Sequence, residues 1–124
     1  VGPFYTMPDE FLVSAESIAR NLIKGHGIAN KFGADAFPYG YVCDIFGHVA
    51  ALPRILNKFG IRGALLSRGL NDDFTPCHFR WVSPDGSEAT TFKAPEVCGY
   101  GSFCLSSPTP NSTWTEWSKR RSNT

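Results

Sequence analysis

The sequence lacks the features that mark several classes of protein. No apolar run approaches the roughly 20 residues that span a membrane, and no segment has the pattern of a signal peptide. The formal net charge is only +1 at pH 7, so there is no excess of basic residues for nucleic acid or an anionic membrane. We therefore expect no nucleic-acid partner, no membrane partner and a cytoplasmic location.

Cysteine is scarce as well. Four cysteines stand at positions 43, 77, 98 and 104, and none forms a Cys-x-x-Cys pair, which argues against a structural zinc knuckle. The even number permits disulfides. The low density of cysteine nevertheless favours reduced thiols that are mostly buried.

The residues that are present indicate one small globular domain. The chain has 124 residues, of which 42% are hydrophobic and 14% aromatic, and these values are typical of a folded domain. The sequence begins with Val1, and Gly2-Pro3-Phe4-Tyr5 resembles the middle of a domain. We therefore expect the chain to be part of a larger protein.

Short apolar runs alternate with helical periodicity in the first half of the chain. We expect strands at residues 3–7, 37–43 and 62–67, and helices at residues 14–32 and from Pro53 to Gly60. Proline is common in the first turn of a helix and glycine just after its end. The order strand, helix, strand, helix, strand predicts right-handed crossovers and a parallel sheet.

A charged residue follows each of the three expected strands. Asp9 follows the first, Asp44 the second and Arg68 the third. The carboxyl ends of parallel strands meet at one edge, where α/β folds build their sites. We therefore expect these three residues to lie near the same edge of one sheet.

The second half of the chain has a different pattern. Residues 79–82 and 88–92 flank a Pro-Asp-Gly turn, which predicts a β-hairpin. Residues 105–124 are rich in Ser, Thr, Pro and Asn, which predicts an irregular tail. The expected fold class is therefore α/β, a partial parallel sheet with crossover helices followed by a hairpin.

A set of short motifs occurs along the chain in a fixed order. From the N-terminus these motifs are Gly2-Pro3-Phe4-Tyr5, Pro8-Asp9-Glu10-Phe11-Leu12-Val13-Ser14, Asp44-Ile45-Phe46-Gly47-His48, Leu52-Pro53-x-Ile55-Leu56, Phe59-Gly60-Ile61, Arg68-Gly69, Pro84-Asp85-Gly86-Ser87 and Gly99-Tyr100. The ordered set resembles the zinc-dependent retaining α-mannosidases of glycoside hydrolase family 38. The resemblance extends to about Tyr100, and we expect residues 1–104 to be part of the family's catalytic domain. It implies a seven-stranded parallel α/β domain, of which three strands are expected here.

The resemblance also implies roles for three residues. Asp44 would be both the catalytic nucleophile and a zinc ligand, Phe46 would line the sugar site, and Arg68 would lie near the nucleophile. The implied substrate is a mannose-containing glycan or oligosaccharide, and the implied cofactor is Zn²⁺. The family's His-x-Asp motif does not occur in this sequence, so the remaining zinc ligands and the general acid are expected outside it.

Each of these residues also has a simpler interpretation. Asp44 could cap a helix or loop, Phe46 could belong to the core, and Arg68 could be a surface arginine. Taken with the ordered motifs, the site is the better interpretation of all three.

Other charged residues and histidines favour structural roles. Asp9 and Glu10 fit charges at the start of the first helix. His48 fits a hydrogen-bonding histidine better than a metal ligand, and His26 and His78 fit surface positions.

Two other functions remain open at this point. The chain could belong to a truncated or degenerate relative that binds carbohydrate without catalysis. A zinc-dependent deacetylase of similar α/β type is less well supported, because no metal triad of its own is visible. A His-x-Asp motif and a further histidine in flanking sequence would favour the enzyme.

Overall fold

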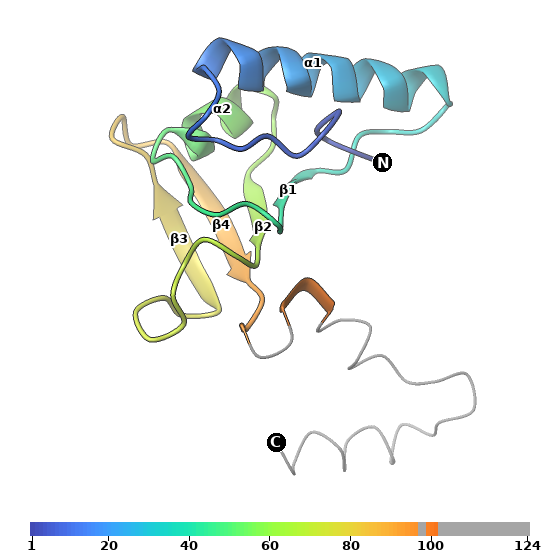
Figure 1. Ribbon diagram of the computed structural model, residues 1–124. Coiled ribbons are helices and arrows are strands. Elements are labelled where there is room, and N and C mark those ends of the chain that lie inside the picture. The colour runs from blue at the N-terminus through green and yellow to red at the C-terminus, as the bar shows by residue number, and fades with distance from the viewer. Residues whose placement is uncertain (97–98, 102–124) are drawn as a thin grey trace, which may run out of the picture.

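The computed structural model describes residues 1–96 and 99–101, which form a four-stranded sheet with two helices (Figure 1). The elements in chain order are α1 (Ala15–Lys31), β1 (Tyr39–Val42), α2 (Leu52–Lys58), β2 (Gly63–Leu66), β3 (His78–Val82), β4 (Glu88–Lys93) and a 3-10 turn, η1 (Gly99–Gly101). Neither helix in these ranges is long and apolar enough to cross a membrane.

Three of the four strands run parallel. The strand order is β1-β2-β4-β3, in which β1 pairs with β2 and β2 with β4 in parallel, while β3 pairs antiparallel with β4 at the edge. Val42 is opposite Leu66, and Leu66 is opposite Lys93, so the three parallel strands end in line. The α/β class is therefore confirmed, and the second strand of the hairpin is the third parallel strand.

Local sequence signals define both helices. Ser14 caps α1, since its Oγ accepts a hydrogen bond from the Ser17 backbone N–H at 3.1 Å. Pro53 lies in the first turn of α2, and Gly60 follows the helix with a positive φ of 73°. The expected helices and the strands near residues 37–43 and 62–67 are confirmed, the strands with narrower bounds.

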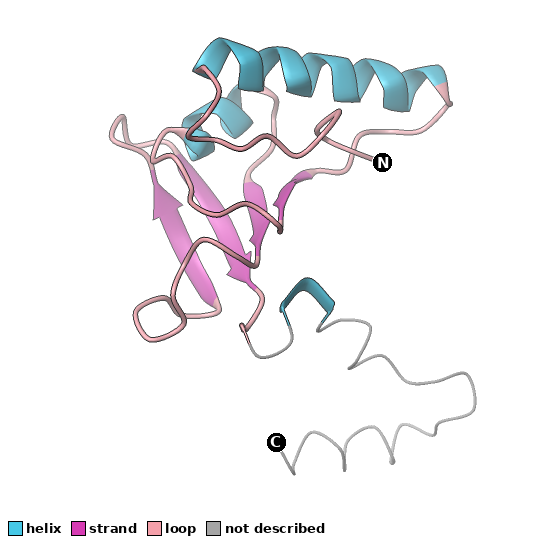
Figure 2. Ribbon diagram, viewed as in Figure 1, coloured by secondary structure: helices cyan, strands magenta, loops and turns pink. Residues whose placement is uncertain are grey.

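The strand expected at residues 3–7 is absent, and the segment runs as an irregular loop (Figure 2). Its backbone groups form hydrogen bonds with a side chain of α1 rather than with a neighbouring strand. The Asn21 Oδ1 accepts hydrogen bonds from the backbone N–H groups of Tyr5 at 2.7 Å and Thr6 at 3.2 Å, and the Asn21 Nδ2 donates to the Thr6 carbonyl. Because one side chain satisfies these groups, the segment needs no sheet partner.

Helix α2 packs against the sheet, and α1 lies over α2 and the N-terminal segment. The α2 side chain Leu56 lies against Gly40 of β1, and α1 packs on the N-terminal segment, with Gly25 against Pro3. The buried core joins these layers and consists of Phe4, Ile18, Leu22, Val42, Ile45, Leu52, Leu56, Ile61, Ala64 and Leu66. This core holds the strand ends, and hence the predicted site, in a fixed frame.

Candidate functional site

Asp44 and Arg68 meet at the carboxyl edge of the parallel strands. Asp44 follows β1 and Arg68 follows β2, and the Arg68 Nε donates to the Asp44 Oδ1 at 2.6 Å. The side chains are 43% and 52% exposed, so both are accessible to a ligand. The hydrogen bond to Asp44 raises the pKa of the Arg68 guanidinium above its usual value. The expected proximity of these two residues is confirmed.

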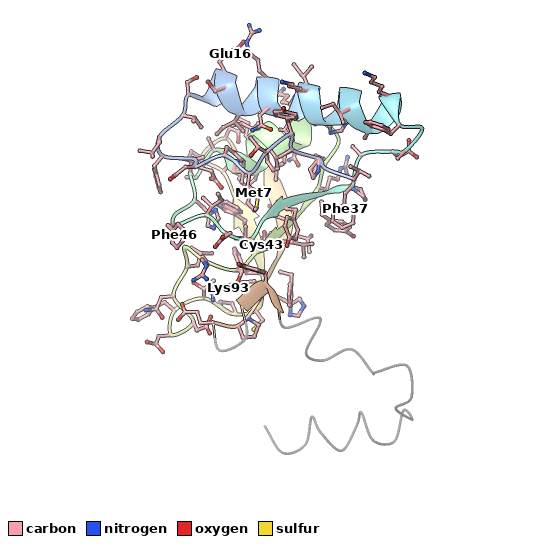
Figure 3. All side chains as sticks on the ribbon, turned by 45° about the vertical axis from the view of Figure 1, so that its right-hand side comes forward. Met7, Glu16, Phe37, Cys43, Phe46 and Lys93 are labelled. Atoms are coloured by element: carbon pink, nitrogen blue, oxygen red, sulfur yellow. The ribbon has the colours of Figure 1, made fainter. Side chains whose placement is uncertain are left out.

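Two exposed aromatic rings lie near the guanidinium of Arg68. The Arg68 Cζ lies 5.6 Å from the ring centroid of Phe46 and 5.9 Å from that of Tyr100, within the range of cation–π contact. Phe46 is 75% exposed and points outward at the edge of the molecule (Figure 3), so it is not a core residue. The sequence patterns assigned no role to Tyr100, although Gly99-Tyr100 is one of the motifs that resemble the family.

The two loops that carry Asp44 and Arg68 touch through their backbones. The Arg68 N–H donates to the Cys43 carbonyl at 3.2 Å. A Cβ placed on Gly69 would lie 2.6 Å from the Gly47 nitrogen, and Gly69 has a φ of +86°. Only glycine fits this approach at position 69 without strain, and the contact explains why Gly follows Arg68.

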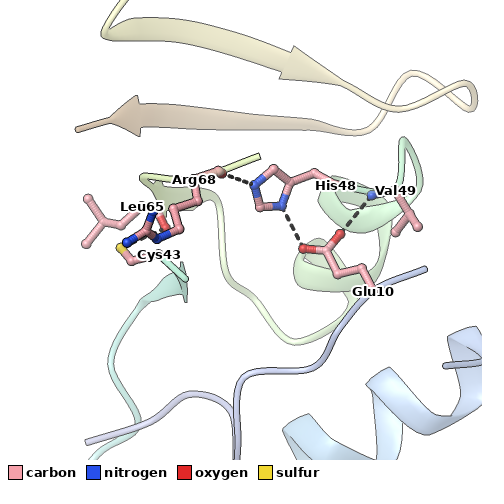
Figure 4. Close-up of polar contacts among 6 residues, drawn as sticks. All are labelled: Glu10, Cys43, His48, Val49, Leu65 and Arg68. Atoms are coloured by element: carbon pink, nitrogen blue, oxygen red, sulfur yellow. Dashed lines mark hydrogen bonds and ion pairs between the residues drawn. The ribbon is translucent and has the colours of Figure 1, made fainter. Parts of the chain in front are cut away.

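A buried pair, Glu10 and His48, lies beside Arg68 (Figure 4). The His48 Nδ1 lies 2.8 Å from the Glu10 Oε1, the Val49 N–H donates to the Glu10 Oε2 at 2.8 Å, and the His48 Nε2 lies 3.0 Å from the Arg68 carbonyl oxygen. The side chains of His48 and Glu10 are 2% and 0% exposed. His48 is thus a hydrogen-bonding histidine, as expected.

The expectations for Asp9 and Glu10 need correction. Ser14 caps α1, and Glu10 points instead into the interior beneath the site. Asp9 is exposed and follows no strand, so the argument that placed it at the sheet edge was wrong. The turn in which the Asp9 carbonyl accepts from the Leu12 N–H directs Glu10, not Asp9, toward the edge.

A third ionic pair, also missed by the sequence analysis, lies at the end of β4. The Lys93 side chain is buried and pairs with Asp72, whose other carboxylate oxygen accepts from the Glu96 N–H at 2.7 Å. The Lys93 ammonium lowers the pKa of the Asp72 carboxyl below its usual value. The turn pattern predicted only that residues 88–92 pair with residues 79–82. In the structure β4 also pairs in parallel with β2, so Lys93 ends a parallel strand.

The predictions of exposure for the other histidines and of burial for the cysteines are confirmed only in part. His78 is exposed, as expected, whereas His26 is half-buried with its ring 5.7 Å from that of Phe59. Cys43 and Cys77 are both free; Cys43 is buried, as expected, and Cys77 is exposed. Burial raises the pKa of the Cys43 thiol. Cys98 and Cys104 lie outside the described residues.

A zinc ion, which the resemblance implies, needs at least three protein ligands at a catalytic site. Residues 1–96 and 99–101 contain no group of three His, Cys, Asp or Glu side chains arranged to hold a metal ion. The described residues therefore do not fit a zinc site by themselves. Asp44 is the one candidate ligand that the sequence suggested.

Comparison with known proteins identifies relatives over most of the chain. A family model described as "Glycosyl hydrolases family 38 N-terminal domain" matches residues 1–120, which is further than the motifs that end at Tyr100. The domain boundary expected at residue 104 and the tail expected at 105–124 lie outside the described residues.

Two relatives are similar in sequence or structure. A protein of Halalkalibacterium halodurans named "Putative mannosylglycerate hydrolase" is 35% identical over 100 residues, which cover 71% of this chain and 11% of that protein. The crystal structure of an alpha-mannosidase from Enterococcus faecalis V583 matches with a TM-score of 0.67 and 31% identity, over 74% of this chain and 11% of that one. The chain thus spans about a tenth of the length of these relatives.

Proposed function

Because this chain belongs to glycosyl hydrolase family 38, we propose that it supplies part of the active site of a retaining α-mannosidase. The observation that carries the proposal is the Asp44–Arg68 pair, exposed at the carboxyl edge of the sheet beside Phe46. Exposed carboxylates at such an edge are where α/β enzymes place their chemistry. The names of the two relatives support an α-mannosyl substrate.

In the proposed reaction Asp44 is the nucleophile. Its carboxylate forms a bond to the anomeric carbon of the mannosyl group while the bond to the leaving oxygen breaks, and an acid protonates that oxygen. Water, deprotonated by the same group, then displaces Asp44 and releases mannose. A retaining enzyme places this second carboxyl about 5 Å from the nucleophile, and we propose that it comes from a part of the longer protein.

Arg68 and Phe46 position the reactants in this proposal. The charged hydrogen bond from the Arg68 Nε keeps Asp44 ionised and fixes its orientation, as a nucleophile requires. The exposed ring of Phe46 offers an apolar surface to a sugar face. Together these groups present an oriented carboxylate beside an exposed aromatic ring.

The family is generally zinc-dependent, and Asp44 is the one ligand that the sequence motifs suggest within the described residues. We therefore propose that the other zinc ligands lie in a longer protein. The 124 residues alone should then show no meaningful mannosidase activity, because the described part of the chain has no group of three ligands for the metal and the acid is proposed to lie elsewhere.

A second candidate is a relative that binds carbohydrate without catalysis. The aromatic rings of Phe46 and Tyr100 beside Arg68 would suit sugar binding alone. Turnover of an aryl α-mannoside by the full-length protein separates the two functions. Hydrolysis that depends on Asp44 supports the enzyme, whereas mannoside binding without hydrolysis supports the second candidate.

A further inference from the structure

Glu10 is the buried end of a set of contacts that leads to the proposed nucleophile. Its neighbours Phe11 and Leu12 are exposed, whereas the Glu10 side chain is fully enclosed and reaches His48 and Val49. We propose that Glu10 is a positioning residue for the Asp44–Arg68 pair, acting through His48. This inference rests on the function proposed above and adds a residue to its site.

The partners of His48 determine how its ring is oriented. A carbonyl oxygen can only accept a hydrogen bond, so the His48 Nε2, 3.0 Å from the Arg68 carbonyl, must carry a proton. The remaining proton lies between the His48 Nδ1 and the Glu10 Oε1, 2.8 Å apart. Whichever of these two atoms holds it, the pair is neutral as a whole. Glu10 therefore fixes the plane of the ring and keeps Nε2–H directed at Arg68.

Arg68 is held at three points by the segment that contains Asp44. Its N–H donates to the Cys43 carbonyl, its carbonyl accepts from His48, and its Nε donates to the Asp44 Oδ1. The first two contacts fix the backbone on either side of the side chain. The direction of the guanidinium toward Asp44 thus depends on the bond from His48, and the ring of His48 depends on Glu10.

Glu10 also connects its own N-terminal loop to the loops that carry Asp44 and Arg68. Its Oε2 accepts from the Val49 N–H, and the Val49 carbonyl accepts from the Leu52 N–H at the start of α2 at 2.9 Å. The carboxylate of Glu10 therefore joins the N-terminal loop to the loop after β1, and His48 extends this link to the loop after β2. Small displacements of a reacting group, on the order of 1 Å, can reduce turnover by about 100-fold.

Two near-isosteric substitutions of His48 test the link to Arg68. In His48→Gln the amide nitrogen takes the place of Nε2 and can still donate to the Arg68 carbonyl. In His48→Asn the amide reaches only the position of Nδ1, so the bond to Arg68 is lost. The readout is the side-chain Nε–H resonance of Arg68 and its exchange with solvent, measured by NMR in the full-length protein and assigned with Arg68→Lys.

We expect His48→Asn to shift this resonance and speed its exchange, and His48→Gln to restore the parental signal. Glu10→Ala should act like His48→Asn, and Glu10→Gln should act like the parent, because an amide can donate to Nδ1 and accept from the Val49 N–H. Turnover of an aryl α-mannoside should fall about 10–100-fold in Glu10→Ala and His48→Asn, the usual effect of removing an outer supporting contact, with the change in kcat rather than KM.

Asp9→Asn is the matched control, because Asp9 is the adjacent exposed carboxylate and should leave both readouts unchanged. An unaltered Arg68 signal in folded His48→Asn would overturn the inference, whatever happens to stability, and would do so even if Glu10→Ala failed to fold. If the parent shows no turnover the proposed function fails, but the Arg68 resonance still decides the positioning role.

Discussion

The two pairs at the carboxyl edge differ in their access to solvent. Asp44 and Arg68 are half-exposed, whereas the side chains of Glu10 and His48 are buried. An exposed ion pair contributes little to stability because water and salt screen it, but it can meet a ligand. A buried pair cannot meet a ligand, and the loss of one partner leaves a buried polar atom of the other unpaired. The comparison separates residues available for chemistry from residues that hold them in place.

The largest expected effect is on turnover when the exposed pair is changed. Asp44→Asn keeps the shape of the side chain but removes the charge required of a nucleophile. In the full-length protein we expect kcat to fall by at least about 1,000-fold, with little change in melting temperature. Hydrolysis of an activated α-mannoside and thermal melts measure the two quantities. Near-parental turnover in Asp44→Asn would refute its catalytic role.

The buried pair should show the opposite pattern, a large loss of stability. Glu10→Ala leaves the Val49 N–H and the His48 Nδ1 without a partner, and we expect the free energy of unfolding to fall by about 3–5 kcal/mol, as for other broken buried pairs. Denaturant unfolding measures this change, with Asp9→Asn as the control. An unchanged unfolding midpoint in Glu10→Ala would mean that the buried pair contributes no more to stability than an exposed one.

Two glycines of α1 extend the comparison to the N-terminal loop that carries Glu10. A Cβ on Gly25 would lie 2.0 Å from the Pro3 carbonyl oxygen, whereas a Cβ on Gly27 would meet nothing within 4 Å. We expect Gly25→Ala to destabilise the protein by about 1–3 kcal/mol through overpacking, and Gly27→Ala to stabilise it by up to about 1 kcal/mol through helix propensity. Paired thermal melts compare them; equal shifts would show that α1 does not fix this loop.

The smallest expected effect concerns the Asp72–Lys93 pair, which is intermediate because only Lys93 is buried. The Lys93 ammonium lowers the pKa of folded Asp72 below its ordinary value of 3.8. The ionised carboxylate therefore stabilises the fold above pH 3.8, and this contribution disappears as the pH falls through the lower folded pKa. Asp72→Asn should lower the melting temperature at neutral pH and converge with the parent in acid.

The neighbouring substitution Asp73→Asn is the control for that experiment, since Asp73 is an exposed carboxylate in the same loop. Its melting temperature should follow that of the parent throughout the titration. A difference between Asp72→Asn and the parent that stayed constant into acid would show that the charge of Asp72 is not the source of its contribution.

Much of the site could be predicted because its position follows from local patterns. Asp44 and Arg68 each come directly after a buried strand, and parallel strands necessarily end at one edge, so their proximity followed from the order of elements. Tyr100 and Lys93 could not be found in this way. Tyr100 comes after the sheet strands in sequence, and Lys93 reaches the edge only because β4 pairs with β2.

The sequence by itself determined the two helices, two of the parallel strands, the hairpin and the exposed pair, because caps, periodicity and turn residues act over a few neighbouring positions. Only the tertiary structure decided that residues 3–7 bond to Asn21 instead of a strand, that β4 completes the parallel sheet, and that Glu10 rather than Asp9 reaches the site. Those outcomes depend on which distant groups satisfy buried hydrogen bonds, and that choice is made only when the layers pack together.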